Sequence, residues 1–305
     1  MKHLFTILLA LYSCSPSFAC INVASYVLKN GHLLYVHREG DVPYGHTFHK
    51  EDYPAIIREL DSLYRTTKDI DYLSDKGLLL LLLEQYENAI QLYLHIEKMT
   101  PGRYATASNL GTAYELSGQN TLALQWIRTA VAIDATSHNN SEWIHINILE
   151  AKVRGEEYPT SDDLLQTSFG TAAQAATTLT APALQQLSDA LFYQLNERIS
   201  FVRPQERCIA LLLFELGNIA LLLGKYEDAL ADYDLADLYG YTGTLIDQRI
   251  KEAKTQLRQA NKPPGTISGP PISSSGFPYM LTILSVIIGI ILIKILYNNS
   301  KRNKA

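Results

Sequence analysis

Apolar residues recur with helical spacing along most of the chain, and between residues 71 and 135 one arrangement of them occurs twice. The two copies are offset by 34 residues, so that Gly77 matches Gly111 and Ala89 matches Ala123. This period is typical of solenoids made of paired antiparallel helices, in which small residues allow close helix contacts and bulky residues fill the space between pairs. The pattern therefore predicts an all-α fold, a helical-hairpin solenoid.

A third copy of the pattern lies nearer the C-terminus, where Leu216, Gly217, Gly224 and Ala229 repeat the spacing. We therefore predict a solenoid over residues 51–260, with its clearest repeats at 70–103, 104–137 and 210–243. The same periodicity predicts further helices at 51–67, 138–154, 184–199 and 244–260, the last as a cap. Residues 155–180 are polar and rich in Ala, Thr and Gly, and we predict an irregular insertion there.

The repeats resemble those of the tetratricopeptide repeat (TPR) family. The second copy matches best, because its residues fall where that family has Leu-Gly, Tyr, Gly and two Ala: Leu110, Gly111, Tyr114, Gly118, Ala123 and Ala130. The family's early Trp is missing from all three copies. Over about residues 20–260 the chain also resembles uncharacterised membrane-anchored TPR proteins of Bacteroidetes-type bacteria. The resemblance implies a concave groove, lined by the first helix of each pair, that binds a protein or peptide partner.

Carrying the family's groove positions over places four polar side chains on that surface: Asn109, Thr112, Glu115 and Asn218. Asn suits such a groove, since its amide pairs with both donors and acceptors of a peptide backbone. The alternative is that these residues are simply solvated. The family's clamp for a C-terminal carboxylate needs basic residues, whereas the matching first-repeat positions hold Ser74 and Leu78. The sequence therefore argues against that clamp.

The N-terminal residues have a different character. Residues 1–19 combine a basic start, a short apolar run and small residues before Cys20, which predicts a secretory signal peptide. Cys20 is then a lipidated cysteine, a free thiol or the partner of Cys208 in a disulfide, although a buried thiol is the expected state of Cys208. Residues 20–50 hold two β-branched and aromatic runs around Asn30-Gly31, which predicts a small β-hairpin followed by a loop.

The C-terminal residues carry a second targeting pattern. Residues 261–277 are rich in Pro, Gly and Ser and predict a flexible linker. Residues 278–297 form an apolar run long enough to cross a bilayer as a transmembrane helix, and residues 298–305 form a basic tail. The positive-inside rule places that tail in the cytoplasm and residues 20–277 in the periplasm or outside the cell.

Composition and sequence motifs exclude several classes of function. A net charge of -5 and a pI near 5.9 argue against nucleic-acid binding. No nucleophile elbow, phosphate loop, zinc motif or dinucleotide motif is present, so we expect no enzyme and no cofactor. The histidine-rich loop at residues 37–52 matches no zinc pattern, and a metal-dependent envelope enzyme is the weakest alternative. We expect a membrane-tethered, exported scaffold for protein–protein interaction. The main alternative is a sensory ectodomain of an envelope signalling complex that acts with a separate cytoplasmic partner.

Overall fold

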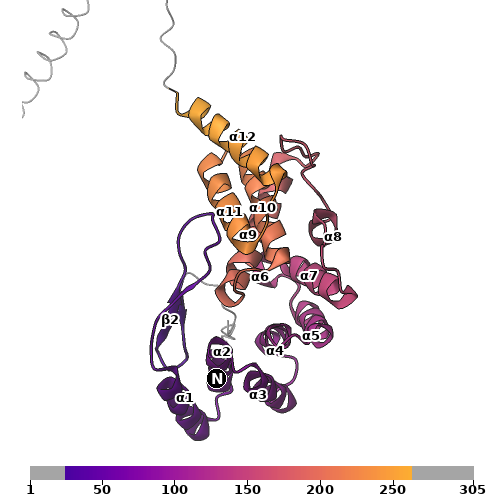
Figure 1. Cartoon of the computed structure of the whole chain (residues 1–305). Coiled ribbons are helices and arrows are strands. Elements are labelled where there is room, and N and C mark those ends of the chain that lie inside the picture. Colours follow the sequence, from indigo (N-terminus) through magenta and orange to yellow (C-terminus); the bar gives the residue numbers. More distant parts are fainter. Residues whose placement is uncertain (1–24, 263–305) are drawn as a thin grey trace, which may run out of the picture. The chain divides into compact units, whose positions relative to one another are not determined.

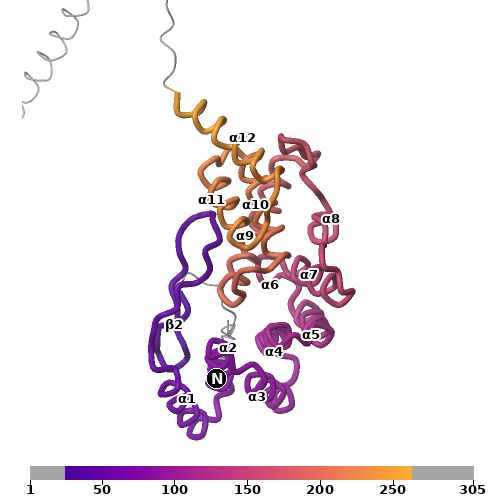
Figure 2. The backbone as a smooth tube through the Cα atoms, viewed as in Figure 1, coloured from indigo at the N-terminus to yellow at the C-terminus, as the bar shows by residue number. Residues whose placement is uncertain are grey.

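The structure, a computed structural model, describes residues 25–262 (Figures 1 and 2). The predicted signal peptide, Cys20, the transmembrane helix at 278–297, the basic tail, and all of the linker after residue 262 lie outside these residues. Between residues 25 and 262, every helix is too short or too polar to cross a membrane. The described elements are β1 (Ser25–Val27), β2 (Leu33–Val36), β3 (Thr47–Phe48), α1 (Tyr53–Thr67), α2 (Asp71–Leu82), α3 (Tyr86–Met99), α4 (Tyr104–Leu116), α5 (Asn120–Ile133), α6 (Ser137–Asn140), α7 (Glu142–Arg154), α8 (Ser161–Leu165), α9 (Ala181–Phe201), α10 (Arg207–Leu222), α11 (Tyr226–Tyr239) and α12 (Thr244–Ala260).

The three sequence repeats fold as three helical hairpins, α2–α3, α4–α5 and α10–α11. In each, a three-residue turn is closed by one equivalent backbone hydrogen bond, such as Gln119 N–H to Tyr114 O at 2.8 Å. The central turn residue has a positive φ, which Gly118 and Gly224 adopt freely and which Glu84 adopts in the first hairpin. The mostly helical, TPR-like arrangement predicted from the 34-residue period is therefore present.

Close contact within each hairpin depends on one glycine. A methyl group on Gly217 would lie 2.6 Å from Cε1 of Tyr233, and one on Gly111 would lie 2.5 Å from Cδ1 of Ile127. Gly77 meets the Tyr93 ring in the same way. In every case the facing residue is 16 positions later, so the glycine repeat and the aromatic or aliphatic repeat are two sides of one contact.

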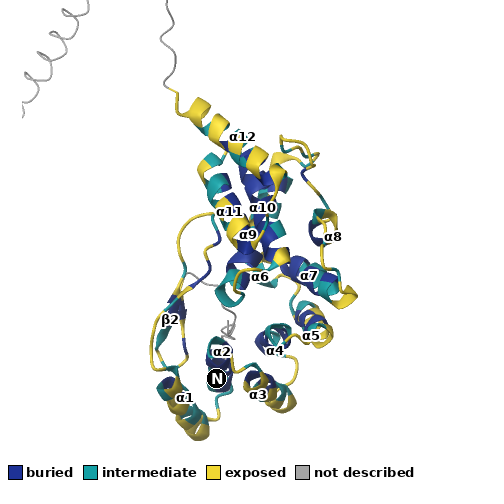
Figure 3. Ribbon diagram, in the orientation of Figure 1, coloured by how far each residue is buried: buried dark blue, intermediate teal, exposed yellow. Residues whose placement is uncertain are grey.

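The chain between the second and third repeats is helical but irregular. The predicted helix at 138–154 is divided into α6 and α7, because His138 and Asn139 have left-handed backbone angles. The insertion at 155–180 contains the short helix α8, and buried Arg249 of α12 donates to the carbonyl groups of Phe169 and Gly170. Helix α10 is the most buried element, whereas α12 exposes its outer face (Figure 3).

The predicted β-hairpin is present and forms part of a larger sheet. Strands β1 and β2 pair antiparallel around Asn30-Gly31, and β3 adds a third strand on the far side of β2. The sequence did not predict β3, because two residues are too few to show alternation. Between β2 and β3, residues 37–46 form a segment that we call the strap. The strap runs beside α9 and α11 in Figure 1, and Lys225, in the turn just before α11, forms an ion pair with Asp41 at 2.7 Å.

Candidate functional site

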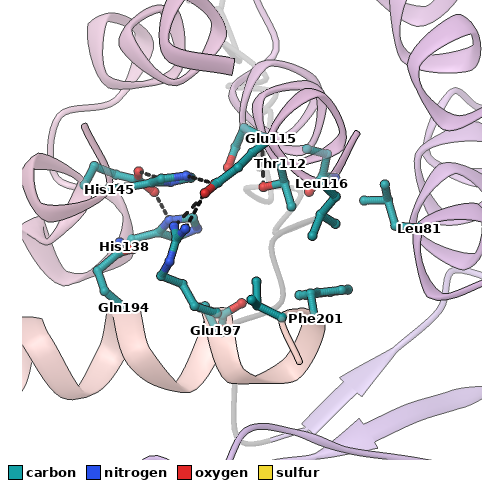
Figure 4. A pocket seen from close by; sticks show the side chains of 14 residues that line it. Leu81, Thr112, Glu115, Leu116, His138, His145, Gln194, Glu197 and Phe201 are labelled. Carbon is teal, nitrogen blue, oxygen red and sulfur yellow. Dashed lines mark hydrogen bonds and ion pairs between the residues drawn. The ribbon is translucent and has the colours of Figure 1, made fainter. Parts of the chain in front are cut away.

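A half-open pocket of about 70 Å³ lies between α4 and α9. Helix α4 supplies one wall from the inner side of the second hairpin, and α9 supplies the facing wall, with α6 and α7 closing one end. Figure 4 shows side chains from these elements converging on the space. The lining residues are Leu81, Ser108, Asn109, Thr112, Glu115, Leu116, His138, Glu142, His145, Gln194, Glu197, Arg198, Phe201 and Val202.

The pocket has an apolar end and a charged end. Leu81, Leu116 and Phe201 lie together on one side in Figure 4, and His138, His145 and Glu115 lie on the other. An apolar surface next to a few convergent polar groups is the usual composition of a ligand pocket in proteins. The pocket therefore suits a group that is itself polar at one end and apolar at the other.

Glu115 is the centre of the charged end. Its side chain is only 8% exposed and receives Arg198, Lys152 Nζ at 2.9 Å and His145 Nε2 at 2.7 Å. Burial by itself would raise the pKa of this carboxyl group, but Arg198, Lys152 and His145 together hold the pKa well below its usual value. Glu115 is therefore an ionised structural acceptor that joins α4 to α7 and α9.

The histidine on α7 links this carboxylate to a second one. His145 Nδ1 lies 3.4 Å from Glu142 Oε2, while its Nε2 contacts Glu115. Although burial opposes the charge, the carboxylates of Glu115 and Glu142 raise the pKa of His145 above its usual value. His138 of α6 also pairs with Glu142, and His138 and His145 hold the pKa of Glu142 far below its usual value.

Helix α9 contributes the arginine of the facing wall. Arg198 is 6% exposed, and both of its terminal nitrogens contact Glu115, with Nη1 at 3.4 Å from Oε2. Its Nε is buried and has no hydrogen-bond partner among the described residues. Helix α9 is fixed from its other side by the strap, where Gly45 N–H donates to Asn196 Oδ1 at 2.9 Å and His46 Nε2 contacts Glu197 at 2.7 Å.

The structure brings three of the four predicted groove residues together. Asn109, Thr112 and Glu115 all line the pocket, although Asn109 is buried and Thr112 and Glu115 are only partly exposed. Asn218 lies apart from them and is fully buried, where it donates to Glu215 and accepts from the Tyr233 hydroxyl at 2.9 Å. It is placed to hold the third hairpin together, and its side chain does not reach an open surface.

Sequence reasoning missed the wall that faces α4. Gln194, Glu197 and Arg198 come from α9, and no motif connects that helix with the second repeat. One signal was available, since polar residues at 194 and 198 interrupt the apolar face of an otherwise amphipathic helix. Buried polar residues of that kind need partners elsewhere in the chain.

The charged groups of this site are engaged in pairs with one another. Cys208 lies at the start of α10, where burial raises the pKa of its thiol to about 12 and makes it a weak nucleophile at neutral pH. Among the described residues, no three His, Cys, Asp or Glu side chains are arranged to bind a metal ion. Within residues 37–52, His37 and His46 lie together beside α9, with ring centroids 5.8 Å apart, His46 contacting Glu197 and His37 contacting Asn196.

Comparison with known proteins gives only distant likenesses. No family model matches the chain, and no curated protein matches it. A solved structure of a MamA RS-1 ArsTM double mutant is similar at 13% identity, with 69% of this chain and 88% of that chain covered and a TM-score of 0.35. A tetratricopeptide repeat protein from Parabacteroides merdae is similar at 13% identity, with 67% and 93% covered and a TM-score of 0.32. At such scores nothing about function follows from either likeness.

Proposed function

We propose that this chain is a non-enzymatic scaffold that binds a protein partner through the pocket between α4 and α9. The observation that carries the proposal is the pocket itself, which joins the inner side of a helical repeat to an apolar patch of Leu81, Leu116 and Phe201. The charged groups beside that patch are tied to one another. Such an arrangement favours holding a ligand group over proton transfer or nucleophilic attack.

The pocket is smaller than the extended groove expected from the sequence. Helix α9 faces α4 across it, and Glu115 and Arg198 bridge the two helices. A peptide therefore has no open channel along the inner side of the second hairpin. The partner would instead insert one side chain or one chain end between α4 and α9, beside Thr112 and Leu116.

We further propose that the scaffold is exported and held at the membrane. This part rests on the sequence alone, with the signal-like residues 1–19 and the apolar run at 278–297. Carbonate extraction of membranes tests it. The whole chain should remain in the membrane pellet, and a chain ending at Lys262 should be released. Release of both would refute the anchor and leave the scaffold proposal standing.

Site-specific crosslinking tests the scaffold function. Leu116 lies in the pocket and is replaced by a diazirine analogue of leucine, which changes its size very little. Leu238 on α11 is 57% exposed and takes the same analogue as the matched control. We expect one protein to crosslink from position 116 and not from 238. Thr112→Trp, which fills the pocket, should abolish the crosslink.

Two results would refute the proposal. One is equal crosslinking from positions 116 and 238, which would indicate nonspecific contact. The other is a position-116 crosslink that persists in Thr112→Trp while circular dichroism shows an unchanged fold, since the partner would then bind without entering the pocket. The readout needs no prior identification of the partner, because the two positions differ only in their location.

A further inference from the structure

We propose that the outer face of α12 docks on a lipid surface that carries anionic headgroups. The docking surface is a basic stripe made of Lys251, Lys254 and Arg258 of α12 and Lys262 just after its end. The inference goes beyond the partner pocket and rests on the proposed membrane anchor, since it names a second contact of the chain with that membrane.

The basic stripe occupies one side of α12. Its three helical members are spaced by three and four residues, and side chains at this spacing lie on the same face of a helix. All four members of the stripe are exposed. The opposite face of α12 is buried through Ile246 and Ala253, and Figure 3 shows the contrast between the two faces. Helix α12 is therefore amphipathic, and its free side is cationic.

The charges of the stripe are not neutralised by the rest of the fold. Within residues 25–262, none of its four cations forms an ion pair. Two carboxylates belong to the same helix. Asp247 lies one turn before the stripe, and Glu252 keeps one carboxylate oxygen buried and interacts with Arg249. The stripe thus presents a net positive charge on a chain whose overall charge is -5.

The neighbouring helix carries the opposite charge. Helix α11 packs beside α12 in Figure 1 and exposes Asp234 and Asp237. An anionic surface attracts α12 and repels α11, so it favours one orientation of the helical array. The charge pattern therefore determines which side of this end of the array faces the lipid.

The composition of the stripe favours lipid over an acidic protein. Residues 251–262 include no large apolar side chain that is exposed. The centre of a protein interface is usually apolar and poor in charged residues, whereas clustered Lys and Arg are sufficient for attraction to anionic headgroups. An acidic protein partner is therefore the less suitable occupant.

The stripe also lies next to the segment that is proposed to anchor the chain. Lys262 is the last described residue, and residues 263–277 separate it from the apolar run at 278–297. A flexible chain of that length has a root-mean-square end-to-end distance of about 20 Å. The anchor would therefore hold α12 near the bilayer at a high effective concentration, so that a moderate attraction is enough for docking.

Photocrosslinking to lipid in nanodiscs tests the inference. The full-length protein carries a diazirine amino acid at Thr255, which is exposed on the same face as the stripe, or at exposed Leu238 of α11 as the matched control. The nanodiscs hold phosphatidylcholine alone, or equal parts of phosphatidylcholine and phosphatidylglycerol. We expect lipid adducts at position 255 to be at least about fivefold more frequent in the anionic nanodiscs, since each cation near such a surface favours docking about fivefold. Position 238 should give few adducts in either.

Two charge variants locate the contact. The stripe variant replaces its three helical cations with glutamine: Lys251→Gln, Lys254→Gln and Arg258→Gln. The control variant does the same at three exposed cations in and before α1: Lys50→Gln, Arg58→Gln and Arg65→Gln. Glutamine has nearly the helix propensity of lysine and arginine, so both variants should keep the fold, which circular dichroism checks. In anionic nanodiscs the stripe variant should lower the adducts at position 255 to the level of neutral nanodiscs, and the control variant should leave them unchanged.

Salt provides an independent readout. Raising the salt concentration from about 0.1 M to about 1 M shortens the Debye length from about 10 Å to about 3 Å, and it should lower the adducts at position 255 as the stripe variant does. The inference is overturned if these adducts are as frequent in neutral as in anionic nanodiscs, if the stripe variant keeps them, or if position 255 crosslinks in native membranes to a protein in place of lipid.

These outcomes leave the anchor proposal standing, because carbonate extraction tests the anchor separately. If that extraction shows that the chain is not anchored, the same full-length proteins are sedimented with vesicles of the two lipid compositions. Sedimentation with anionic vesicles alone, lost in the stripe variant, would support the inference. Sedimentation with neither kind of vesicle, or equally with both, would overturn it.

Discussion

Removing the charge of Glu115 should destabilise the protein far more than removing the charge of an exposed glutamate. In Glu115→Gln the side chain keeps its shape, but Arg198 and Lys152 lose their shared counterion. These groups are 6% and 24% exposed, so water compensates them poorly. Breaking a buried ion pair by removing one partner costs about 3–5 kcal/mol, and Gln still accepts one hydrogen bond, so we expect about 3 kcal/mol.

A matched control lies on α7. Glu150 pairs with Arg128 and Arg154, which are 57% and 47% exposed, and such surface pairs contribute at most about 1 kcal/mol. Urea unfolding and thermal unfolding, both followed by circular dichroism at pH 7, measure the two variants. For a folded region of this size, about 3 kcal/mol corresponds to a fall of roughly 6–12 °C in Tm. Glu150→Gln should shift Tm by no more than about 4 °C.

A double variant checks the cause. Arg198→Met removes the cation and keeps an apolar chain of similar length, so Glu115→Gln and Arg198→Met together should cost at least about 1 kcal/mol less than the sum of the two single changes. If Glu115→Gln costs no more than Glu150→Gln, or if the two effects simply add, then Glu115 and Arg198 do not form the coupled buried pair described above.

Three further predictions concern other parts of the molecule. Gly217→Ala should lower the unfolding free energy by about 1–3 kcal/mol in urea titration, because the new methyl group meets the buried Tyr233 ring. Gly118→Ala is the contrasting variant, since its added methyl group meets nothing within 4 Å and any loss comes from the strain at its φ of +80°. Burial raises the pKa of Asp75 to about 6, so the folded state holds the proton of this carboxyl group more tightly than the unfolded state does. The free energy of unfolding should therefore fall as pH rises from about 4 to 7, by roughly 3 kcal/mol relative to Asp75→Asn. Parallel curves of stability against pH for the two proteins would contradict this. Cys208, whose thiol pKa is raised from 9.0 to about 12, should have a thiolate fraction roughly a thousandfold lower than an ordinary thiol, and peptide mapping should show it alkylated quickly in urea and very slowly in the folded protein.

The repeats could be predicted because their physical signals are local. Gly111 and Ile127 are 16 residues apart, the 34-residue period fixes their register, and a turn glycine such as Gly118 marks the end of the first helix. These signals need no knowledge of distant parts of the chain. The helices of the first two hairpins consequently lie within their predicted repeats, and in the third α10 begins three residues before the predicted start at 210.

The pocket could be predicted only on one side. Asn109, Thr112 and Glu115 follow from the repeat register, whereas Arg198 reaches Glu115 across 83 residues of sequence. The interpretation of Asn218 as a groove residue assumed that equivalent repeat positions have equivalent surroundings. In the third hairpin the amide of Asn218 is hydrogen-bonded to the Tyr233 hydroxyl and to the Glu215 carboxyl group, and its side chain is buried.

The strap also has a consequence for how the chain folds. In a simple repeat array each unit contacts its neighbours, so units can form one after another along the sequence. Here Gly45 pairs with Asn196 and Asp41 pairs with Lys225, contacts that span 151 and 184 residues. The strap cannot reach its final position until α9 and α11 have formed. Such long-range contacts raise the contact order, slow folding and couple the two ends of the described helices, so that the array should unfold as one cooperative unit.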